Sequence, residues 1–592
     1  FLGDLERASN HEKRAVELFS AIHDPANLLI ALGELGLLYE VQDEFERAIQ
    51  AYQRAYDLAK SLNQSKDAAR VAVNLSAAYI ENDQWNVAEE WNEQSRKSDP
   101  GGGSSEPYQI LNAARIADHR GQTDLAIRMY REIANRPGVP PTLVWNCDSF
   151  LAMIRVQQKK YAGADREYRA LLKIIDQTRS DLLEPQFKIT FLSSLIRFHQ
   201  DYVDLLVTQN DNTNALRIIE SSRARVLTER LVGKDAAIPN SIDIPQLKQL
   251  AKDTNTSLLS FWIAPKRSFA WLIDKSGVHR FDLPPEDQIE SLVTAYRETV
   301  EHALRDPIAA ADPNGPKLWN ALLAQIAPKI PKNGRVVIIP DGPLHRLNFE
   351  TLPVPSPTPH YWIEDVEIAI APSLAIAASK PEPPREGNPS LLLIGAPDYT
   401  GTDFRFLAKA GAEIHDIEAR FPKLERAVYT GRQASPDAYR ASQPARFSLI
   451  HFAAHAEASH ESPLESAVVL SRHGDSNKLY ARDVIDQPIH ADLVTISGCR
   501  SAGVRAYAGE GLIGFAWAFL QAGARSVVAG LWDVSDSSTE PLMNRFYAGI
   551  AAGQPPSTAM RNAKLALLKG GAGYSKPYYW APFQVYLRTI RK

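Results

Sequence analysis

A histidine and a cysteine each follow a strand-like apolar run, and together they could carry out nucleophilic catalysis. The run 447–452 ends three residues before His455, and the run 493–497 ends two residues before Cys499. In open α/β sheets, reactive groups gather at the carboxyl ends of the strands. A thiol attacks a carbonyl carbon only as the thiolate, so this chemistry needs a neighbouring imidazole that lowers the thiol pKa. The pattern therefore predicts a cysteine nucleophile with a histidine base.

Each of these residue types also has a simpler structural explanation. A single cysteine is usually a small buried hydrophobe, and we expect this of Cys147, which falls in a helical segment. We likewise expect His451, inside the strand-like run, to be a core residue. His451 and His455 have the H-x-x-x-H spacing, but on a strand and without the glutamate of a zinc peptidase. We therefore expect no metal and no cofactor.

Composition narrows the classes of protein that this chain could be. Its 592 residues exceed one compact core, and 44% hydrophobic with 23% charged residues is ordinary for globular protein. A net charge of −4 lacks the basic field of a nucleic-acid-binding chain, so we expect no direct nucleic-acid partner. No apolar run reaches the roughly 18 residues that cross a bilayer, so no membrane association is expected. Two cysteines in the whole chain favour a reducing compartment, and we expect a cytoplasmic protein.

Residues 1–233 have the small/aromatic spacing of tetratricopeptide (TPR) repeats. In this pattern a small residue lets two helices approach and an aromatic residue fills the gap between them. The anchors recur at irregular intervals: Ala15/Phe19, Ala48/Tyr52, Ala88, Ala126/Tyr130, Ala164/Tyr168 and Ala215. We expect five or six repeats with a turn at 101–105, and a surface that binds other protein segments. A generic helical bundle is the alternative.

After the repeats the chain changes to α/β character. A linker is expected at 234–254, followed by an α/β half at 255–380 without cysteine, a proline-rich linker at 380–389 and a second α/β half at 388–592. Apolar runs without alternation favour strands buried on both faces, in a mostly parallel, helix-covered sheet. The predicted strands are 257–263, 269–273, 335–339, 366–371, 391–394, 447–452, 493–497 and 526–531, and the predicted helices are 408–421, 511–522 and 540–551, the last with Ser537 as its N-cap.

Many separate stretches, in order, resemble the CHAT domain of the caspase, gingipain and separase group of cysteine peptidases. The matching stretches from His451 onward are HFAAHA (451–456), SGCRSAG (497–503), GEGLIGFAWAFLQAGARSVVAGLWDVSDSST (509–539), LMNRFYAGIAAG (542–553) and AMRNAKLALL (559–568). The upstream stretches are SRARVLTERL (222–231), RVVIIPDGPLHRLNFETLP (335–353), APSLAIA (371–377) and LIGAPDY (393–399). The resemblance covers roughly 255–592, and TPR arrays are a common companion of this domain.

The resemblance implies a catalytic dyad of His455 and Cys499 and no third member. It implies that Cys499 attacks the scissile carbonyl while His455 assists proton transfer to the leaving amine. Backbone N–H groups of Cys499 and Ala456 would stabilise the oxyanion. The chain departs from the family at Ala456, where glycine is usual, and in the Ser-Gly pair before the cysteine.

By analogy with caspase-like folds, the pocket for the residue before the cut would include Asp398, Ser497, Trp532 and Asp533. Two carboxylates there would suit a basic side chain. The alternative is that Asp398 and Asp533 cap turns or orient loops.

Residues and resemblance together predict a TPR–CHAT cysteine endopeptidase. We expect its repeats to recruit a protein substrate or to receive a regulatory protein or complex, with weak activity in isolation. The resemblance extends to bacterial defence, in which an infection signal would release the protease. A catalytically inactive caspase-like TPR scaffold is the alternative. An unrelated thiol hydrolase on a doubly wound sheet is a third hypothesis, but it has no use for the repeats.

Overall fold

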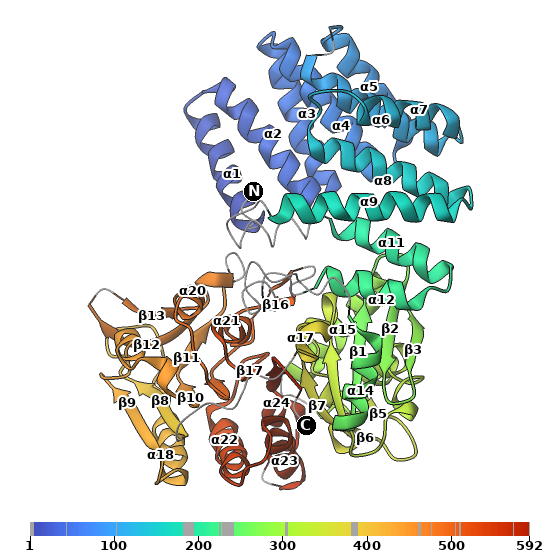
Figure 1. Cartoon of the computed structure of the whole chain (residues 1–592). Coiled ribbons are helices and arrows are strands. Elements are labelled where there is room, and N and C mark those ends of the chain that lie inside the picture. Colours follow the sequence, from blue (N-terminus) through green and yellow to red (C-terminus); the bar gives the residue numbers. More distant parts are fainter. Residues whose placement is uncertain are drawn as a thin grey trace. The chain divides into compact units, whose positions relative to one another are not determined.

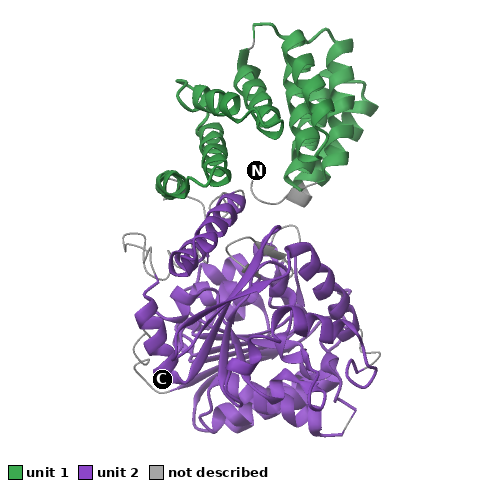
Figure 2. Ribbon diagram, turned by 90° about the vertical axis from the view of Figure 1, so that its right-hand side faces the viewer, with its two compact units in different colours: residues 1–191 green, residues 192–592 purple. Residues whose placement is uncertain are grey.

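The structure, a computed structural model, describes the chain except residues 1–4, 43, 102, 181–194, 224–226, 228–241, 302–305, 380–388, 460–462, 475, 504, 508–510, 572 and 591–592. It divides into two compact units, residues 1–191 and residues 192–592 (Figure 2). Each unit is described by itself below.

Unit 1 consists of helices packed in sequence order (Figure 1). They are α1 (Leu5–Ala21), α2 (Pro25–Val41), α3 (Phe45–Ser61), α4 (Ser65–Glu81), α5 (Trp85–Ser98), α6 (Glu106–His119), α7 (Thr123–Ala134), α8 (Pro141–Gln157) and α9 (Tyr161–Ser180), with the short 3₁₀ turn η1 (Gly103–Ser105). The small and aromatic anchors pack as predicted. Ala48 and Tyr52 are fully buried, and a Cβ added at Gly36 would lie 2.4 Å from the Tyr52 ring. This contact is the physical reason for the repeat pattern, and the repeat prediction is confirmed.

Several turns between the helices of unit 1 contain a residue with a left-handed backbone conformation. The residue at which the chain reverses after a helix has a positive φ at His23, Asn63, Asp83, Gly121 and Lys159. A left-handed residue ends a helix within one step, which keeps the connection to the next helix short.

Two further helices, α11 (Ile196–Thr208) and α12 (Asn212–Ser221), belong to unit 2. The buried Glu220 carboxylate accepts hydrogen bonds from the N–H groups of Leu374 (2.7 Å) and Ala375 (3.2 Å). The buried Arg223 guanidinium donates to Ser260 Oγ at 2.8 Å. These buried polar contacts fix the end of α12 to the α/β region. The unit boundary thus precedes the predicted end of the repeats at 233, which lies outside the described residues.

Unit 2 is built on an 11-stranded sheet in the order β3-β2-β1-β4-β7-β18-β17-β14-β10-β8-β9. Its strands are β1 (Thr256–Trp262), β2 (Ser268–Ile273), β3 (Val278–Leu283), β4 (Arg335–Ile339), β7 (Glu367–Ile370), β8 (Ser390–Pro397), β9 (Glu425–Gly431), β10 (Leu449–Ala453), β14 (Leu493–Ser497), β17 (Ser526–Gly530) and β18 (Phe583–Leu587). Small sheets pair β11 (His455–Glu457), β12 (Ala467–His473) and β13 (Ser476–Tyr480); β15 (Arg505–Tyr507) and β16 (Gly511–Ile513); and β5 (Pro353–Val354) and β6 (His360–Tyr361).

Helices cover the large sheet. They are α14 (Ile244–Thr254), α15 (Glu286–Glu301), α16 (Asn314–Leu322), α17 (Leu374–Ala377), α18 (Ala410–Arg420), α19 (Pro436–Ala441), α20 (Ala481–Ile485), α21 (Phe515–Ala522), α22 (Asp536–Ala551), α23 (Pro556–Lys569) and α24 (Pro577–Trp580). The 3₁₀ turns are η2 (Ala327–Lys329), η3 (Gly342–Arg346), η4 (Phe349–Thr351), η5 (Trp362–Glu364), η6 (Pro444–Arg446) and η7 (Pro463–Glu465). Successive residues of β10 contact opposite layers, because side chains alternate along a strand. His451 contacts Tyr547 of α22, and Phe452 contacts Phe519 of α21.

The two predicted α/β halves form one continuous sheet. The last strand, β18, lies between them, parallel to β7 and antiparallel to β17. Most of the other pairings in the described sheet are parallel, and the central strands are buried on both faces. The predicted α/β fold with a mostly parallel, helix-covered sheet is confirmed.

Several element bounds differ from the prediction. The predicted helix 511–522 is the strand β16 followed by α21, because Gly514 has an extended backbone that separates them. Helix α22 begins at Asp536 with Ser535 as N-cap, so the predicted cap at Ser537 is wrong. Part of the predicted linker, Ile244–Thr254, is helix α14. Residues 234–241 and 380–388 of the two predicted linkers lie outside the described residues.

Candidate active site

The two predicted catalytic residues leave neighbouring parallel strands at the same edge of the sheet. Strands β10 and β14 pair in register, with Ala453 opposite Ser497, and His455 and Cys499 each follow two residues later. The strand ends are in contact, since a Cβ added at Gly498 would lie 2.7 Å from the Ala454 carbonyl oxygen. A glycine is therefore required there, and the spacing predicted from the sequence follows from the register.

The 399–405 segment, which follows β8, holds His455 at its backbone and at its ring. The Tyr399 hydroxyl accepts a hydrogen bond from the His455 N–H and donates one to the Val469 carbonyl, both at 2.9 Å. The imidazole lies 5.1 Å from the Tyr399 ring and 5.6 Å from the Phe404 ring, measured between centroids. Its Nε2 is 2.7 Å from the Arg405 carbonyl oxygen. A carbonyl can only accept, so Nε2 carries the proton, and the neutral ring keeps its lone pair on Nδ1.

The turn that carries Cys499 is fastened to strand β17 by a buried hydroxyl. Ser501 Oγ lies 3.1 Å from the carbonyl oxygens of both Ile496 and Gly498, which share its one proton, and it accepts from the Gly530 N–H at 2.8 Å. Ser501 is 2% exposed, so these contacts are shielded from water. The thiol of Cys499 is therefore presented from a turn whose backbone is held on both sides.

The Cys499 thiol is half-buried, and its surroundings favour the protonated form. Burial raises the pKa of Cys499, and the nearby Asp533 carboxylate raises it further, whereas the Val534 N–H and the Arg500 charge lower it. Asp533 also forms an ion pair with Arg500, with Oδ1 3.1 Å from Nε. Both Cys499 and His455 lie within the described part of the chain, and no hydrogen bond joins their side chains. Catalytic hydrogen bonds are often long without substrate and tighten when it binds.

Ala456, the predicted oxyanion contributor, lies in strand β11 opposite Val468 of β12. Its φ is negative, so alanine in place of the family's glycine costs no backbone strain here. A Cβ added at Gly498 would lie 3.6 Å from the Ala456 nitrogen, which places this N–H beside the cysteine turn.

Asp398 does not present a free carboxylate. It accepts hydrogen bonds from the Thr400 hydroxyl (2.6 Å) and N–H (3.0 Å) and pairs with Arg432 at 3.0 Å. The Thr400 hydroxyl, followed by the Thr400 N–H and Arg432, lowers the pKa of Asp398 to about 2. Asp398 thus shapes the turn that begins the 399–405 segment.

The other three predicted pocket residues lie around the cysteine turn. Ser497 is the last residue of β14 and is buried. The buried Trp532 donates its indole N–H to the Tyr578 carbonyl at 3.3 Å. Asp533, whose side chain is 61% exposed, is the carboxylate that acts on Cys499. The structure therefore places Asp533 beside Cys499 and Asp398 next to Tyr399, which contacts His455.

The residues predicted to be structural are confirmed as such. His451 is fully buried, with Nε2 2.9 Å from Glu413 and Nδ1 3.1 Å from the Tyr547 hydroxyl. His451 and His455 therefore face different surroundings. Cys147 is fully buried, and burial raises its pKa to about 12, which leaves it unreactive at neutral pH.

Sequence reasoning missed three supports of the site: the Arg405 carbonyl, the Tyr399 hydroxyl and Ser501. The first is a main-chain atom and has no side-chain signal. Tyr399 ends the LIGAPDY stretch and Ser501 lies in SGCRSAG, so both stood in stretches that already resembled the family.

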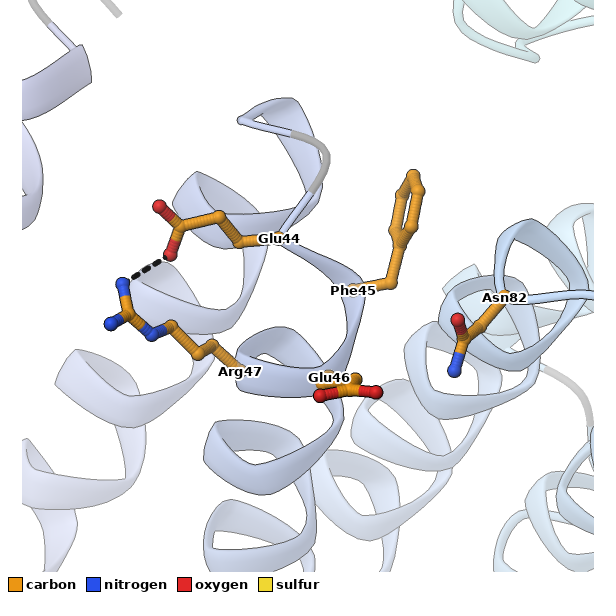
Figure 3. Close-up of a pocket in the computed structure, with 5 residues that line it drawn as sticks. All are labelled: Glu44, Phe45, Glu46, Arg47 and Asn82. Carbon is orange, nitrogen blue, oxygen red and sulfur yellow. Dashed lines mark hydrogen bonds and ion pairs between the residues drawn. The ribbon is translucent and has the colours of Figure 1, made fainter.

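A cavity of about 410 Å³ lies in unit 1, away from these residues in sequence. It is lined by Glu44, Phe45, Glu46, Arg47 and Asn82, and Figure 3 shows the ion pair between Glu44 and Arg47 at 2.7 Å. Both charged partners are exposed, and the cavity forms no part of the candidate active site.

Residues 312–588 match the family model of the CHAT domain. The match covers a little under half of the chain, includes most strands of the large sheet, and shows that this region is a CHAT domain. With its helical repeats, the chain is a TPR–CHAT protein.

Two curated relatives and one solved structure extend this picture. Tetratricopeptide repeat protein 28 of Mus musculus is 30% identical over 105 residues, and that of Homo sapiens 29% over 107, each match covering 18% of this chain. The matched part spans 4% of the length of these relatives. A crystal structure of the Saccharomyces cerevisiae separase–securin complex, at 9% identity, superposes with a TM-score of 0.51 over 100% of this chain and 49% of that chain. That likeness concerns the fold. Among the described residues, no helix combines the length and the apolar character of a membrane span.

Proposed function

We propose that this protein is a cysteine endopeptidase with His455 and Cys499 as its dyad. The observation that carries the proposal is the in-register pairing of β10 and β14, which brings both residues to one sheet edge. The Arg405 carbonyl supports it, because it selects the imidazole tautomer whose Nδ1 can accept a proton.

In the proposed reaction, the thiol proton of Cys499 passes to Nδ1 of His455 and Sγ attacks the scissile carbonyl carbon. The N–H groups of Cys499 and Ala456 receive the oxyanion. The C–N bond then breaks, and the imidazolium gives its proton to the leaving amine. Water hydrolyses the thioester and restores the free thiol.

We propose that Asp533 recognises a basic residue before the cut, since it is the exposed carboxylate beside Cys499. A substrate arginine or lysine would compete with Arg500 for it. Replacing Asp533 by asparagine should lower the preference for basic residues by about tenfold, the order expected for one charge-assisted contact. Peptide-library profiling measures this, with Asp398→Asn as the comparison at a carboxylate already occupied by Thr400 and Arg432. An unchanged preference in Asp533→Asn would discard the role.

The helical repeats would recruit a protein substrate or receive a regulatory partner, the use typical of such surfaces. The raised thiol pKa supports weak activity of the isolated chain, so rapid digestion of unfolded casein without a partner would contradict this part. Two free thiols fit a reducing compartment such as the cytoplasm. A role in bacterial defence remains a proposal from family resemblance.

The same raised pKa favours one rival, a catalytically inactive scaffold. A mixture of peptidyl acyloxymethyl ketones separates the two functions, because these reagents label a thiol activated by a base. For an enzyme, Cys499 should be labelled selectively, and His455→Ala should slow labelling by about a hundredfold or more. Mass spectrometry of the labelled peptides locates the modified thiol. Equal labelling of Cys147 and Cys499, unaffected by His455→Ala, would establish the scaffold instead.

A further inference from the structure

The ring of His455 packs against two aromatic rings that come from one short segment. The rings of Tyr399, Phe404 and His455 are mutually in contact, with Tyr399 and Phe404 5.8 Å apart and the imidazole 5.1 and 5.6 Å from them. Such packing limits rotation of the imidazole. It favours the ring orientation in which Nε2 reaches the Arg405 carbonyl and Nδ1 is left available.

The Tyr399 hydroxyl acts on the backbone of the same residue. His455 and Val469 stand opposite each other in the β11–β12 pair, and the hydroxyl bridges the N–H of one to the C=O of the other. Tyr399 is 6% exposed, so little water can replace its hydroxyl. Without it, the buried Val469 carbonyl and the partly buried His455 N–H would both lose their partner, and His455 would have to move to satisfy them.

The chain on both sides of the 399–405 segment is held by hydrogen bonds. The Asp398 N–H donates to Ser471 Oγ of strand β12 at 2.8 Å, and the Lys409 N–H donates to the Asp536 carboxylate at 3.1 Å. Within the segment, the Thr402 hydroxyl donates to the Tyr399 carbonyl at 2.7 Å. The backbone that carries Tyr399 and Phe404, the two residues in contact with His455, is therefore fixed by hydrogen bonds.

From these contacts we propose that Tyr399 and Phe404 are positioning residues that set the orientation of His455 for reaction with Cys499. The inference rests on the proposed peptidase function. It adds the residues that orient the His455 imidazole. Both rings contact the imidazole, and among the described residues no hydrogen bond joins the Tyr399 hydroxyl to Cys499. We therefore expect their effect on the thiol to pass through His455.

This expectation gives a direct test on the full-length chain. The rate of Cys499 alkylation by iodoacetamide is measured by mass spectrometry, well below the unfolding temperature of every variant. Tyr399→Phe keeps the ring and removes only the hydroxyl, and it should slow alkylation by about tenfold, as expected for a small displacement of a catalytic group. In the His455→Ala background the same substitution should have no further effect. A merely structural role would slow or speed alkylation in both backgrounds.

Tyr439→Phe is the matched control. Tyr439 is a fully buried tyrosine that packs on Phe452 of strand β10, and its hydroxyl has no hydrogen-bond partner among the described residues. It should leave alkylation unchanged in both backgrounds. Phe404 is half-buried, and Phe404→Leu should slow alkylation of Cys499 when His455 is present and have no effect in the His455→Ala background. This variant tests the positioning role if Tyr399→Phe does not fold.

The possible failures are distinct. If His455→Ala alkylates as fast as the natural chain, the dyad is refuted and this inference falls with it. If His455→Ala is slow while Tyr399→Phe and Phe404→Leu are not, only the positioning role is refuted. An equal effect of Tyr399→Phe with and without His455 also refutes it.

Discussion

Replacing Cys499 by alanine should lower the rate of peptide-bond cleavage by about ten-thousandfold or more. The substitution removes the atom that would form the covalent intermediate, and loss of a nucleophile costs nearly all of the chemical rate enhancement. The measurement is mass-spectrometric identification of new protein N-termini after long incubation of a cell proteome with the full-length chain. Proteins cut by the natural chain and spared by Cys499→Ala are the direct substrates.

Cys147→Ala provides the matched control, because it removes the other thiol of the chain. Cys147 is fully buried in helix α8, and burial raises its pKa and so disfavours the reactive thiolate. Cleavage should persist in this variant wherever unit 1 remains folded, which circular dichroism verifies. Cleavage that survives Cys499→Ala, or that is lost equally in Cys147→Ala, would contradict the assignment of the nucleophile.

The second large effect concerns a buried ion pair that joins the two halves of the α/β region. Lys564 of α23 is fully buried and donates to the carboxylate of Glu350 in η4 and to the Phe583 carbonyl of β18. Lys564→Met should lower the free energy of unfolding by about 3 to 5 kcal/mol, because it leaves a buried carboxylate without its counter-charge. Denaturant unfolding of unit 2 followed by tryptophan fluorescence measures the loss.

Two comparisons show whether the pair itself is responsible. The double variant Lys564→Met/Glu350→Met should recover most of the lost stability, since it buries no uncompensated charge. Lys569 lies on the same helix, is 63% exposed and is 3.6 Å from Glu364. Lys569→Met should change the free energy of unfolding by about 1 kcal/mol or less, as usual for an exposed pair. Equal losses at Lys564 and Lys569 would show that the buried pair has no special role.

Several strands of the large sheet, including the strand that precedes Cys499, could be predicted closely. The predicted runs 335–339 and 493–497 coincide with β4 and β14. Strands that are buried on both faces have continuous apolar sequences, which makes them easy to recognise. Strand β18, by contrast, alternates apolar and polar residues in its short FQVYL run and went unpredicted. Its place between β7 and β17 depends on pairings with residues far away in the chain.

The pocket carboxylates show where residue type alone is insufficient. Asp398 and Asp533 are the same residue type at comparable strand ends. Asp398 is hydrogen-bonded to Thr400 and Arg432, whereas Asp533 lies beside the Cys499 thiol. Such a difference depends on which side chains the neighbouring turns bring within hydrogen-bond reach.

The amino-acid sequence alone determined the repeat array and the α/β class and singled out the two candidate residues, since apolar patterns and small-residue spacing are local properties of the chain. Only the tertiary structure decided that a single sheet joins both halves and that the Arg405 carbonyl fixes the tautomer of His455. The reason is physical: main-chain atoms are the same at every position. Which carbonyl meets an imidazole is settled only when segments 50 residues apart fold against each other.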